Sequence, residues 1–228
     1  MKAELFCALE EALNKNATCA IVTDIEDGQQ VLLQDSEVIG SLCMTADQLV
    51  SARKMMKEYL SGTIDDTNLF VRAYAPPLRM IVVGAAHIAQ ALVPMAQLAG
   101  FDVVVVDPRD SFVEASHLSD LRPVADWPDD AMMALAPDNR TAVVTLTHDP
   151  KLDDPALAVA LKSPAFYLGS LGSTRTHAKR LQRLKEKGFS EKDLGRIYGP
   201  VGLNIKAKTP SEIAVAILAQ VIEVWRKL

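Results

Sequence analysis

The feature that most constrains the fold of this chain is an apolar run that ends in a glycine and opens into an amphipathic helix. The run Met80–Val83 is followed by Gly84 and then by the apolar spacing of a helix. A second apolar run stops at Asp107, about 20 residues later. This order is typical of a dinucleotide-binding βαβ unit, in which helix N-terminal amides face a pyrophosphate and the carboxylate meets a ribose hydroxyl.

The match to the glycine fingerprint G-x-G-x-x-G is partial. Gly84 fills the first position, but Ala86 and Ala89 stand at the second and third. Alanine is accepted at the third position, whereas the methyl group of Ala86 stands where a phosphate approaches most closely. His87 would either hydrogen-bond a phosphate or cover the end of the strand.

Composition and charge narrow the class of protein. The chain has 228 residues, 49% of them hydrophobic and 23% charged, as in an ordinary soluble protein of one large or two small domains. A net charge of −5 argues against nucleic acid as a partner. Without a long apolar run or a signal peptide, we expect a cytoplasmic protein and no membrane contact. Cys7, Cys19 and Cys43 are too scattered for a disulfide framework, and no metal site is predicted.

Residues 1–75 predict a small α+β domain, which Ala75-Pro76-Pro77 separates from the rest. Asp27-Gly28 is typical of a hairpin turn. Thr45 followed by Gln48 is a capping box, and we expect its helix to stop near Gly62. The other elements expected here are a helix over 5–13 and strands at 19–23, 30–33 and 69–73.

Residues 76–228 predict the second domain, of the α/β class: a Rossmann-like doubly wound parallel sheet, because strands and helices alternate there. Its last helix begins with Thr209 as N-cap, Pro210 at the first position and Glu212 as capping partner. The apolar stripe of that helix predicts a core face, and it permits a homodimer. The expected strands are Arg79–Val83, Asp102–Val106, Thr141–Thr145 and Ala165–Leu168, with a weaker candidate at Leu121–Val124, and the expected helices are His87–Ala99, Asp129–Leu135, Asp154–Leu161 and Thr174–Lys187.

Ligands of this fold gather outside the carboxyl ends of the strands, so the residues that follow each strand form the candidate cofactor site. These residues are Gly84, Ala85, Ala86, His87, Asp107, Arg109, Thr147, His148, Asp149, Gly169, Ser170, Gly172, Ser173 and Arg175.

The stretch Gly169–Arg175 is a second glycine-rich turn that leads into a helix. Such a turn presents successive N–H groups to an anion, and Arg175 in the first helical turn opposes the helix dipole unless an anion lies between. The alternative is an N-cap at Ser173 beside a solvated arginine. Two anion-binding turns on neighbouring strands would suit a dinucleotide or another diphosphate.

The segment Thr147–Asp154 is dense in ionisable groups. His148 or Lys151 could act as acid or base on a substrate. The alternative is a simple connection in which Asp153 or Asp154 caps the next helix at Pro155, and that cap is expected in either case.

Three further features leave alternatives open. Arg109 could pair with Asp107 or meet a phosphate. The glycines at 199 and 202 are interpreted as a turn before the last element. Cys43 could ligate a soft metal or carry sulfur, although a half-buried structural cysteine is the simpler interpretation. No P-loop, nucleophile elbow or paired catalytic carboxylates are present, which favours binding over turnover.

At these residues the chain resembles the xanthine dehydrogenase accessory proteins, the XdhC/CoxI family. The order and spacing match over about residues 79–225, and two blocks, T-H-D-P-K-x-D-D-P-A-L and G-S-x-G-S-x-R-T-H, are long and distinctive. The matching segments are Val83–Leu92, Val106–Arg109, Leu146–Leu157, Tyr167–His177 and Ile197–Leu203.

The resemblance implies a maturation factor for molybdenum hydroxylases, acting as a cofactor-binding chaperone and not as an enzyme. Such a protein binds the molybdenum cofactor (molybdopterin), supports its sulfuration, in which a sulfurtransferase could take part, and delivers it to the apo molybdenum hydroxylase. Members often self-associate. The family commonly carries a glycine triplet followed by an acidic residue in its N-terminal domain, and the corresponding stretch Ile39–Asp47 has no triplet.

Two alternatives remain from the residues alone. The first is an NAD(P)-dependent oxidoreductase, in which His148 or Lys151 would be the acid or base. The second is a docking module of the same fold that has lost its ligand.

Overall fold

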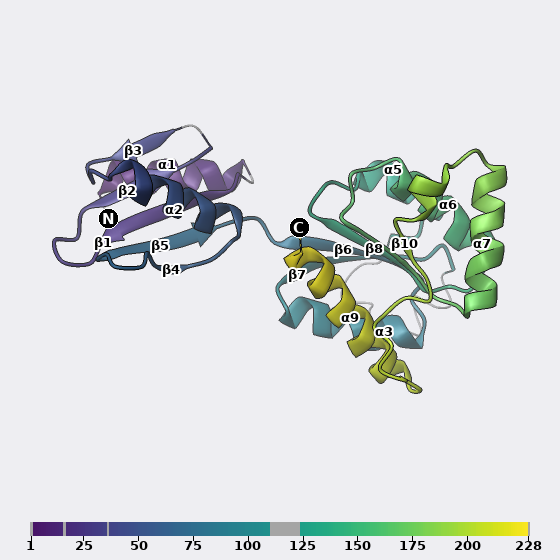
Figure 1. The fold of residues 1–228 in the computed structure, drawn as a ribbon. Coiled ribbons are helices and arrows are strands. Elements are labelled where there is room, and N and C mark those ends of the chain that lie inside the picture. The colour runs from purple at the N-terminus through teal and green to yellow at the C-terminus, as the bar shows by residue number, and fades with distance from the viewer. Residues whose placement is uncertain (1, 16, 36, 110–123, 228) are drawn as a thin grey trace. The chain divides into compact units, whose positions relative to one another are not determined.

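A computed structural model describes residues 2–15, 17–35, 37–109 and 124–227. The chain divides into two compact units, Met1–Pro76 and Pro77–Leu228 (Figure 1). Each unit has its own sheet and is described separately.

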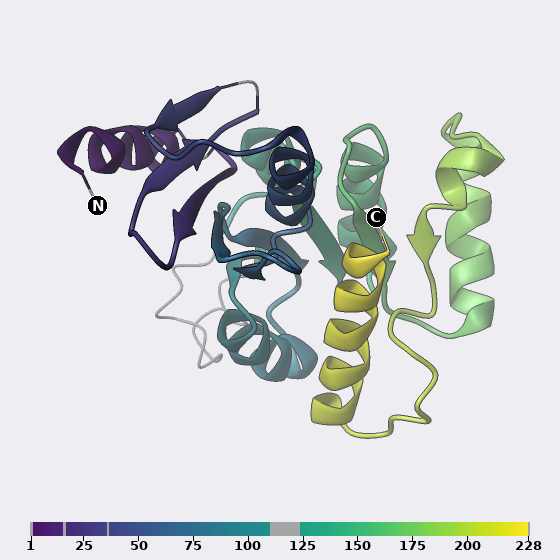
Figure 2. The same ribbon diagram turned by 60° about the vertical axis from the view of Figure 1, so that its left-hand side comes forward.

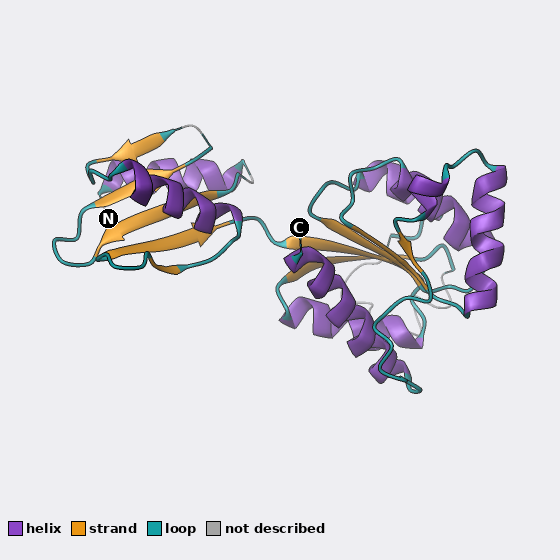
Figure 3. Cartoon of the chain, viewed as in Figure 1, coloured by secondary structure: helices purple, strands orange, loops and turns teal. Residues whose placement is uncertain are grey.

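The first unit is an antiparallel sheet with a helix on each face (Figure 3). Along β1, Cys19 and Ile21 pack toward α1, whereas Ala20 and Val22 pack toward α2, because successive side chains of a strand point to opposite faces. The strand order is β3-β2-β1-β5-β4, and the elements are α1 Ala3–Asn14, β1 Cys19–Asp24, β2 Gln30–Leu33, β3 Val38–Gly40, α2 Ala46–Lys57, β4 Gly62–Thr63 and β5 Leu69–Tyr74.

The capping box of α2 is confirmed, but the predicted end of that helix is wrong. Thr45 Oγ1 accepts from Gln48 N at 3.3 Å, and Gln48 Oε1 accepts from Thr45 N at 2.8 Å. The helix ends at Lys57, before Gly62, because Tyr59 takes a left-handed φ of 56°. Leu60 therefore leaves the buried stripe and is 46% exposed.

The second unit contains a five-stranded parallel sheet of order β10-β9-β8-β6-β7, and its doubly wound α/β fold is confirmed. The elements are β6 Leu78–Val83, α3 His87–Leu98, β7 Phe101–Val106, α5 Pro128–Leu135, β8 Thr141–Thr145, α6 Pro150–Leu161, β9 Tyr167–Ser170, α7 Thr174–Glu186, α8 Glu191–Leu194, β10 Ile197–Tyr198 and α9 Pro210–Arg226.

The strand order places a topological switch point beside β6. The chain leaves β6 through α3 to reach β7 on one side, and it later returns to β8 on the other side of β6. In open parallel sheets the ligand crevice lies outside the carboxyl ends of the strands at such a point. We therefore expect the binding site between the turns that follow β6 and β8.

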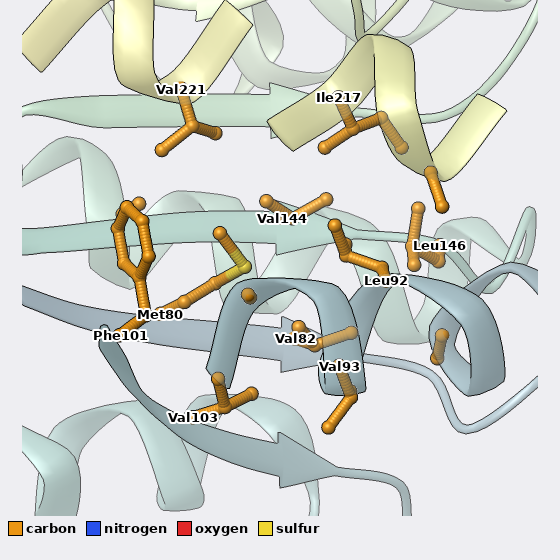
Figure 4. Close-up of a cluster of buried hydrophobic side chains, with 14 of the residues drawn as sticks. Met80, Val82, Leu92, Val93, Phe101, Val103, Val144, Leu146, Ile217 and Val221 are labelled. Atoms are coloured by element: carbon orange, nitrogen blue, oxygen red, sulfur yellow. The ribbon is translucent and has the colours of Figure 1, made fainter. Parts of the chain in front are cut away.

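Two apolar cores flank the sheet. Met80 and Val82 face α3 and α9, whereas Ile81 and Val83 face α5 and α6. Figure 4 shows the first of these cores, with Ile217 of α9 opposite the sheet. The predicted capping box at the start of α9 is confirmed, and its stripe is core. Figure 2 shows α9, in yellow, entered from the segment that follows β10.

Two predicted boundaries in the second unit are wrong. Helix α6 begins at Pro150 with Asp149 as its cap, so neither Asp153 nor Asp154 is an N-cap; both are buried inside the helix. Strand β9 runs over Tyr167–Ser170, two residues later than predicted, because its last residues pair with β8.

The weaker strand candidate at 121–124 lies outside the described residues except for Val124, which forms an isolated parallel bridge with Val106. Within the described part of the chain, no helix combines the length and the apolar character needed to cross a membrane.

Candidate functional site at the carboxyl edge

Four turns follow the carboxyl ends of β6, β7, β8 and β9, which meet at one edge of the parallel sheet. Strand β8 lies between β6 and β9, so the prediction that the two glycine-rich turns follow neighbouring strands is wrong. Adjacent strands are about 4.8 Å apart, so the ends of β6 and β9 are separated by roughly 10 Å. The four turns hold Gly84–Ala86, Asp107–Arg109, Leu146–Asp149 and Leu171–Ser173.

The turn after β6 is packed directly against the segment after β8. Gly84 has a φ of +110°, and a Cβ at this position would lie 2.8 Å from Thr147 Cγ2 and 3.2 Å from Thr147 N. Gly84 N also donates to Val106 O at 2.8 Å. The ends of three strands are therefore held together around this glycine.

Helix α3 begins without a side-chain cap. Its N-cap is Ala86, which supplies no acceptor to the first-turn amides, and the first turn contains no acidic residue. Free N–H groups and the helix dipole favour an anion at such an end. His87 is exposed beside it, and Ala86 is half-buried.

Asp107 is fully buried and bonded within the protein. Its Oδ2 accepts from Ala85 N at 2.8 Å and from Arg109 Nη2 at 2.7 Å, and its Oδ1 accepts from Arg109 Nε at 2.8 Å and from Arg109 N at 3.1 Å. Of the two alternatives predicted for Arg109, the structure shows the ion pair with Asp107. Because Ala85 N donates to this carboxylate, it is not free to bind a ligand, and only the amides from Ala86 onward are left without a side-chain acceptor.

Burial alone would raise the pKa of Asp107, but the hydrogen bonds from Arg109 and Ala85 outweigh it and hold the pKa below the ordinary value of 3.8. The ionised carboxylate therefore stabilises the folded unit. That contribution is present above the ordinary pKa and is lost as the pH falls through the folded-state value.

We expect the stability difference between the unaltered chain and Asp107→Asn to shrink as the pH is lowered from neutral to below 3.8. Urea unfolding at a series of pH values measures it. A difference that stays constant over this range would contradict the assignment of a lowered pKa.

The segment after β8 is held by its own side chains. Thr147 Oγ1 donates to Asp153 Oδ1 at 2.6 Å, and Asp149 caps α6 by accepting from Lys151 N at 2.9 Å. His148 takes a left-handed φ of 62° and is exposed, as is Lys151. The two candidate acid or base residues, His148 and Lys151, therefore lie at the surface beside the carboxyl edge of the sheet.

The turn after β9 is shorter than predicted. Gly169 and Ser170 are buried strand residues, and Ser170 Oγ lies 2.5 Å from Thr145 Oγ1 in a hydrogen bond. Gly172, with a φ of +144°, and Ser173 form the turn. Ser173 caps α7 by accepting from Thr176 N at 3.2 Å, so the capping alternative is confirmed.

Arg175 is exposed in the first turn of α7, while a second arginine that we did not predict lies buried below the same turn. Arg180 Nη2 donates to Leu171 O at 2.9 Å. The available signal was its spacing, since Arg180 precedes the buried Leu184 by one helical turn and so lies on the inward face.

The glycine cluster at 199 and 202 also belongs to this edge, because Gly199 directly follows β10. A Cβ at Gly199 would overlap the ring of His177 on α7. The prediction of a turn before the last helix is confirmed, and the structure adds that the turn packs against α7.

In the first unit, Cys43 is exposed, so the prediction of a half-buried cysteine is wrong. A cavity of about 350 Å³ lies near the stretch predicted to replace the glycine triplet, lined in part by Lys2, Asp27–Gln30 and Ile39–Ser41. Among the described residues, no group of three or more histidine, cysteine, aspartate or glutamate residues is placed to hold a metal ion.

Comparisons with known proteins agree with this fold. A family model described as the XdhC Rossmann domain matches residues 80–221. The chain is 35% identical over 157 residues to the molybdenum cofactor insertion chaperone PaoD of Escherichia coli, a match that covers 69% of this chain and 43% of PaoD. It is 30% identical over 167 residues to a probable xanthine dehydrogenase subunit of Bacillus subtilis, covering 71% of this chain and 47% of that protein.

A solved structure described as a xanthine dehydrogenase from Bacillus halodurans superposes with a TM-score of 0.73 at 25% identity. The likeness covers 99% of this chain and 66% of that one. The chain therefore spans less than half the length of these two curated relatives, and about two thirds of the solved chain.

Proposed function

Because the chain belongs to the XdhC family, we propose that it is a maturation factor for a molybdenum hydroxylase, which binds the molybdenum cofactor or a related nucleotide and aids its insertion. The relative PaoD is named as a chaperone for inserting this cofactor. We propose the same non-enzymatic role here, with an apo hydroxylase as the partner that receives the cofactor. A sulfurtransferase and a second copy of the chain are further proposed partners.

The observation that carries this proposal is the uncapped start of α3 at the switch point. The first-turn amides after Ala86 have no side-chain acceptor, and they face the edge where a parallel sheet binds its ligand. A phosphate group of the cofactor would accept from these amides. Asp107 and Arg109 hold the neighbouring turn in place through Ala85 N.

We expect the substitution Ala86→Asp to weaken cofactor binding while leaving the fold intact. Ala86 has the extended backbone of an N-cap, with a φ of −77°, so an aspartate there would accept from the same amides that a phosphate needs. Calorimetry under anoxic conditions with isolated molybdenum cofactor should show an affinity at least about tenfold lower, while thermal stability stays equal or rises.

Lys2→Asp is the matched control, because Lys2 is also an extended N-cap with no side-chain capping hydrogen bond, at α1 of the other unit, where its Nζ instead donates to Ser41 Oγ at 3.2 Å. It should gain the cap without changing cofactor affinity. No binding of the cofactor by the unaltered chain would refute the proposal. Tight binding of NADH in its place, with hydride transfer to a substrate, would support the oxidoreductase alternative.

A further inference from the structure

The ion pair of Asp107 and Arg109 lies where a dinucleotide-binding fold holds the ribose of its ligand. In such folds an acidic residue at the end of the second strand accepts hydrogen bonds from the ribose hydroxyls, next to the pyrophosphate at the start of the first helix. Asp107 directly follows β7, the second strand of this unit, and its Oδ2 accepts from Ala85 N, two residues before α3 begins at His87. The carboxylate is therefore in the position that this role requires.

The acceptor positions of this carboxylate are all used within the protein. An ionised carboxylate has about four positions for accepted hydrogen bonds, two on each oxygen. Oδ1 accepts from Arg109 N at 3.1 Å and from Arg109 Nε at 2.8 Å, and Oδ2 accepts from Ala85 N at 2.8 Å and from Arg109 Nη2 at 2.7 Å. The carboxylate is also fully buried. A ribose hydroxyl would find neither a free acceptor position nor access to one.

The side chain of Arg109 closes this position. Its guanidinium places one N–H on each oxygen of Asp107, in the two-pronged contact that arginine makes with carboxylates. Without the guanidinium, the backbone amides of Ala85 and Arg109 would still fill one position on each oxygen, and the second position on each would be open. Two adjacent acceptors are what the neighbouring hydroxyls of a ribose need. Arg109 is a third exposed, so the space that its side chain fills borders the solvent.

The stabilising role of the pair and its effect on ligands are separable. The bond that holds the turn after β6 runs from Ala85 N to Asp107 and does not involve the side chain of Arg109. The guanidinium instead covers the oxygens on the side where a ligand would approach them. Removing it therefore changes which ligand groups can reach Asp107 while the bond to Ala85 N remains.

We propose that Arg109 is a specificity-determining residue, which closes the ribose position of this edge by occupying both oxygens of Asp107. The ligand is then held by its phosphate and not through a ribose diol. The inference rests on the proposed function, since it takes the start of α3 as the phosphate position. It narrows the ligand class to phosphate-bearing molecules that are recognised without their ribose, and it excludes NAD bound as dinucleotide-binding folds usually bind it.

The test compares ADP with 2′-deoxy-ADP, which lacks one of the two hydroxyls that Asp107 would accept. Calorimetry on the full unaltered chain should show no difference between the two nucleotides. Arg109→Ala opens one acceptor position on each oxygen of Asp107. ADP should bind this variant about tenfold or more tightly than 2′-deoxy-ADP, as expected for a hydrogen bond to a charged group.

Arg183→Ala is the matched control, because Arg183 holds the buried Asp154 by the same two-pronged contact. Its Nε and Nη2 lie 2.5 and 3.0 Å from the two oxygens of Asp154, and its side chain is 34% exposed, compared with 33% for Arg109. Asp154 lies within α6 and not at the end of β7. Losing this arginine removes an equal charge and an equal contact, and the variant should not distinguish the two nucleotides.

Arg109→Lys serves if Arg109→Ala does not fold. Lysine keeps the positive charge, but its ammonium lacks the planar fork that occupies both oxygens at once. A preference for ADP over 2′-deoxy-ADP should therefore appear in this variant as well, smaller than in Arg109→Ala.

The inference is overturned if the unaltered chain binds ADP more tightly than 2′-deoxy-ADP. It is also overturned if neither Arg109 variant prefers ADP, including the case in which none of the proteins binds either nucleotide. Failure of the proposed function would be seen separately. If the unaltered chain does not bind the molybdenum cofactor but Arg109→Ala prefers ADP, Arg109 keeps its role in specificity and the maturation role is lost.

Discussion

Replacing Asp107 with leucine is expected to lower the free energy of unfolding of the second unit by about 2–4 kcal/mol. The carboxylate is fully buried and accepts four hydrogen bonds, from Ala85 N and from the backbone and side chain of Arg109. Leucine has the same branched shape, with a larger volume and no acceptor, so the buried Ala85 amide loses its partner. The guanidinium of Arg109, which is a third exposed, can turn toward water and limits the loss.

Urea unfolding at neutral pH measures this effect. Asp102→Asn is the control, because Asp102 lies on the same strand with an exposed side chain, and its loss should change stability by less than about 0.5 kcal/mol. Asp107→Asn keeps one acceptor and should fall between the two. If Asp107→Leu were as stable as Asp102→Asn, the carboxylate would not be what holds the turns after β6 and β7 together.

The dependence on Asp107 also explains why the edge could be predicted only in part. In the sequence Asp107 directly follows an apolar run that is predicted to be a strand, and in the structure it directly follows β7. Its partner is set by the fold, because Ala85 N reaches the carboxylate only once β6 and β7 are paired in register. The carboxylate of Asp107, which the pattern predicts to bind a ribose hydroxyl, accepts its hydrogen bonds from Ala85 and Arg109.

The start of α6 shows a second limit of the sequence. Both Asp149-Pro150 and Asp154-Pro155 fit the pattern of a cap followed by proline at the first helical position. Packing decides between them, because Leu152 is buried one turn before Pro155 and the helix must begin early enough to bury it. By contrast, the start of α9 has one such pattern, Thr209-Pro210, and it was predicted correctly.

Strand order is a third limit. The chain order β6, β7, β8, β9 places two strands between the glycine-rich turns, and nothing in the residues tells which of them lies between in space. The structure puts β8 there. The same uncertainty hid the buried position of Arg180, since its partner Leu171 O lies in the turn after β9, which only the fold places beside α7.

Substituting Gly84 with alanine is expected to cost about 2–4 kcal/mol of stability and to weaken ligand binding at the same edge. Two effects add. A φ of +110° is strained for any residue with a Cβ, and that Cβ would lie 2.8 Å from Thr147 Cγ2 and 3.2 Å from Thr147 N. The side-chain atom can move, but the backbone nitrogen belongs to the segment that Asp153 holds in place.

Gly100→Ala separates the two effects, because Gly100 also has a positive φ of +87° but its added Cβ would meet nothing within 4 Å. Its cost, about 1 kcal/mol, measures strain alone. Adding Thr147→Ser to Gly84→Ala removes Cγ2 and keeps the hydroxyl donor to Asp153, so it should recover part of the loss, with a coupling of about 0.5–2 kcal/mol. Equal costs at Gly84 and Gly100, with no recovery by the serine, would mean that the turns after β6 and β8 do not touch.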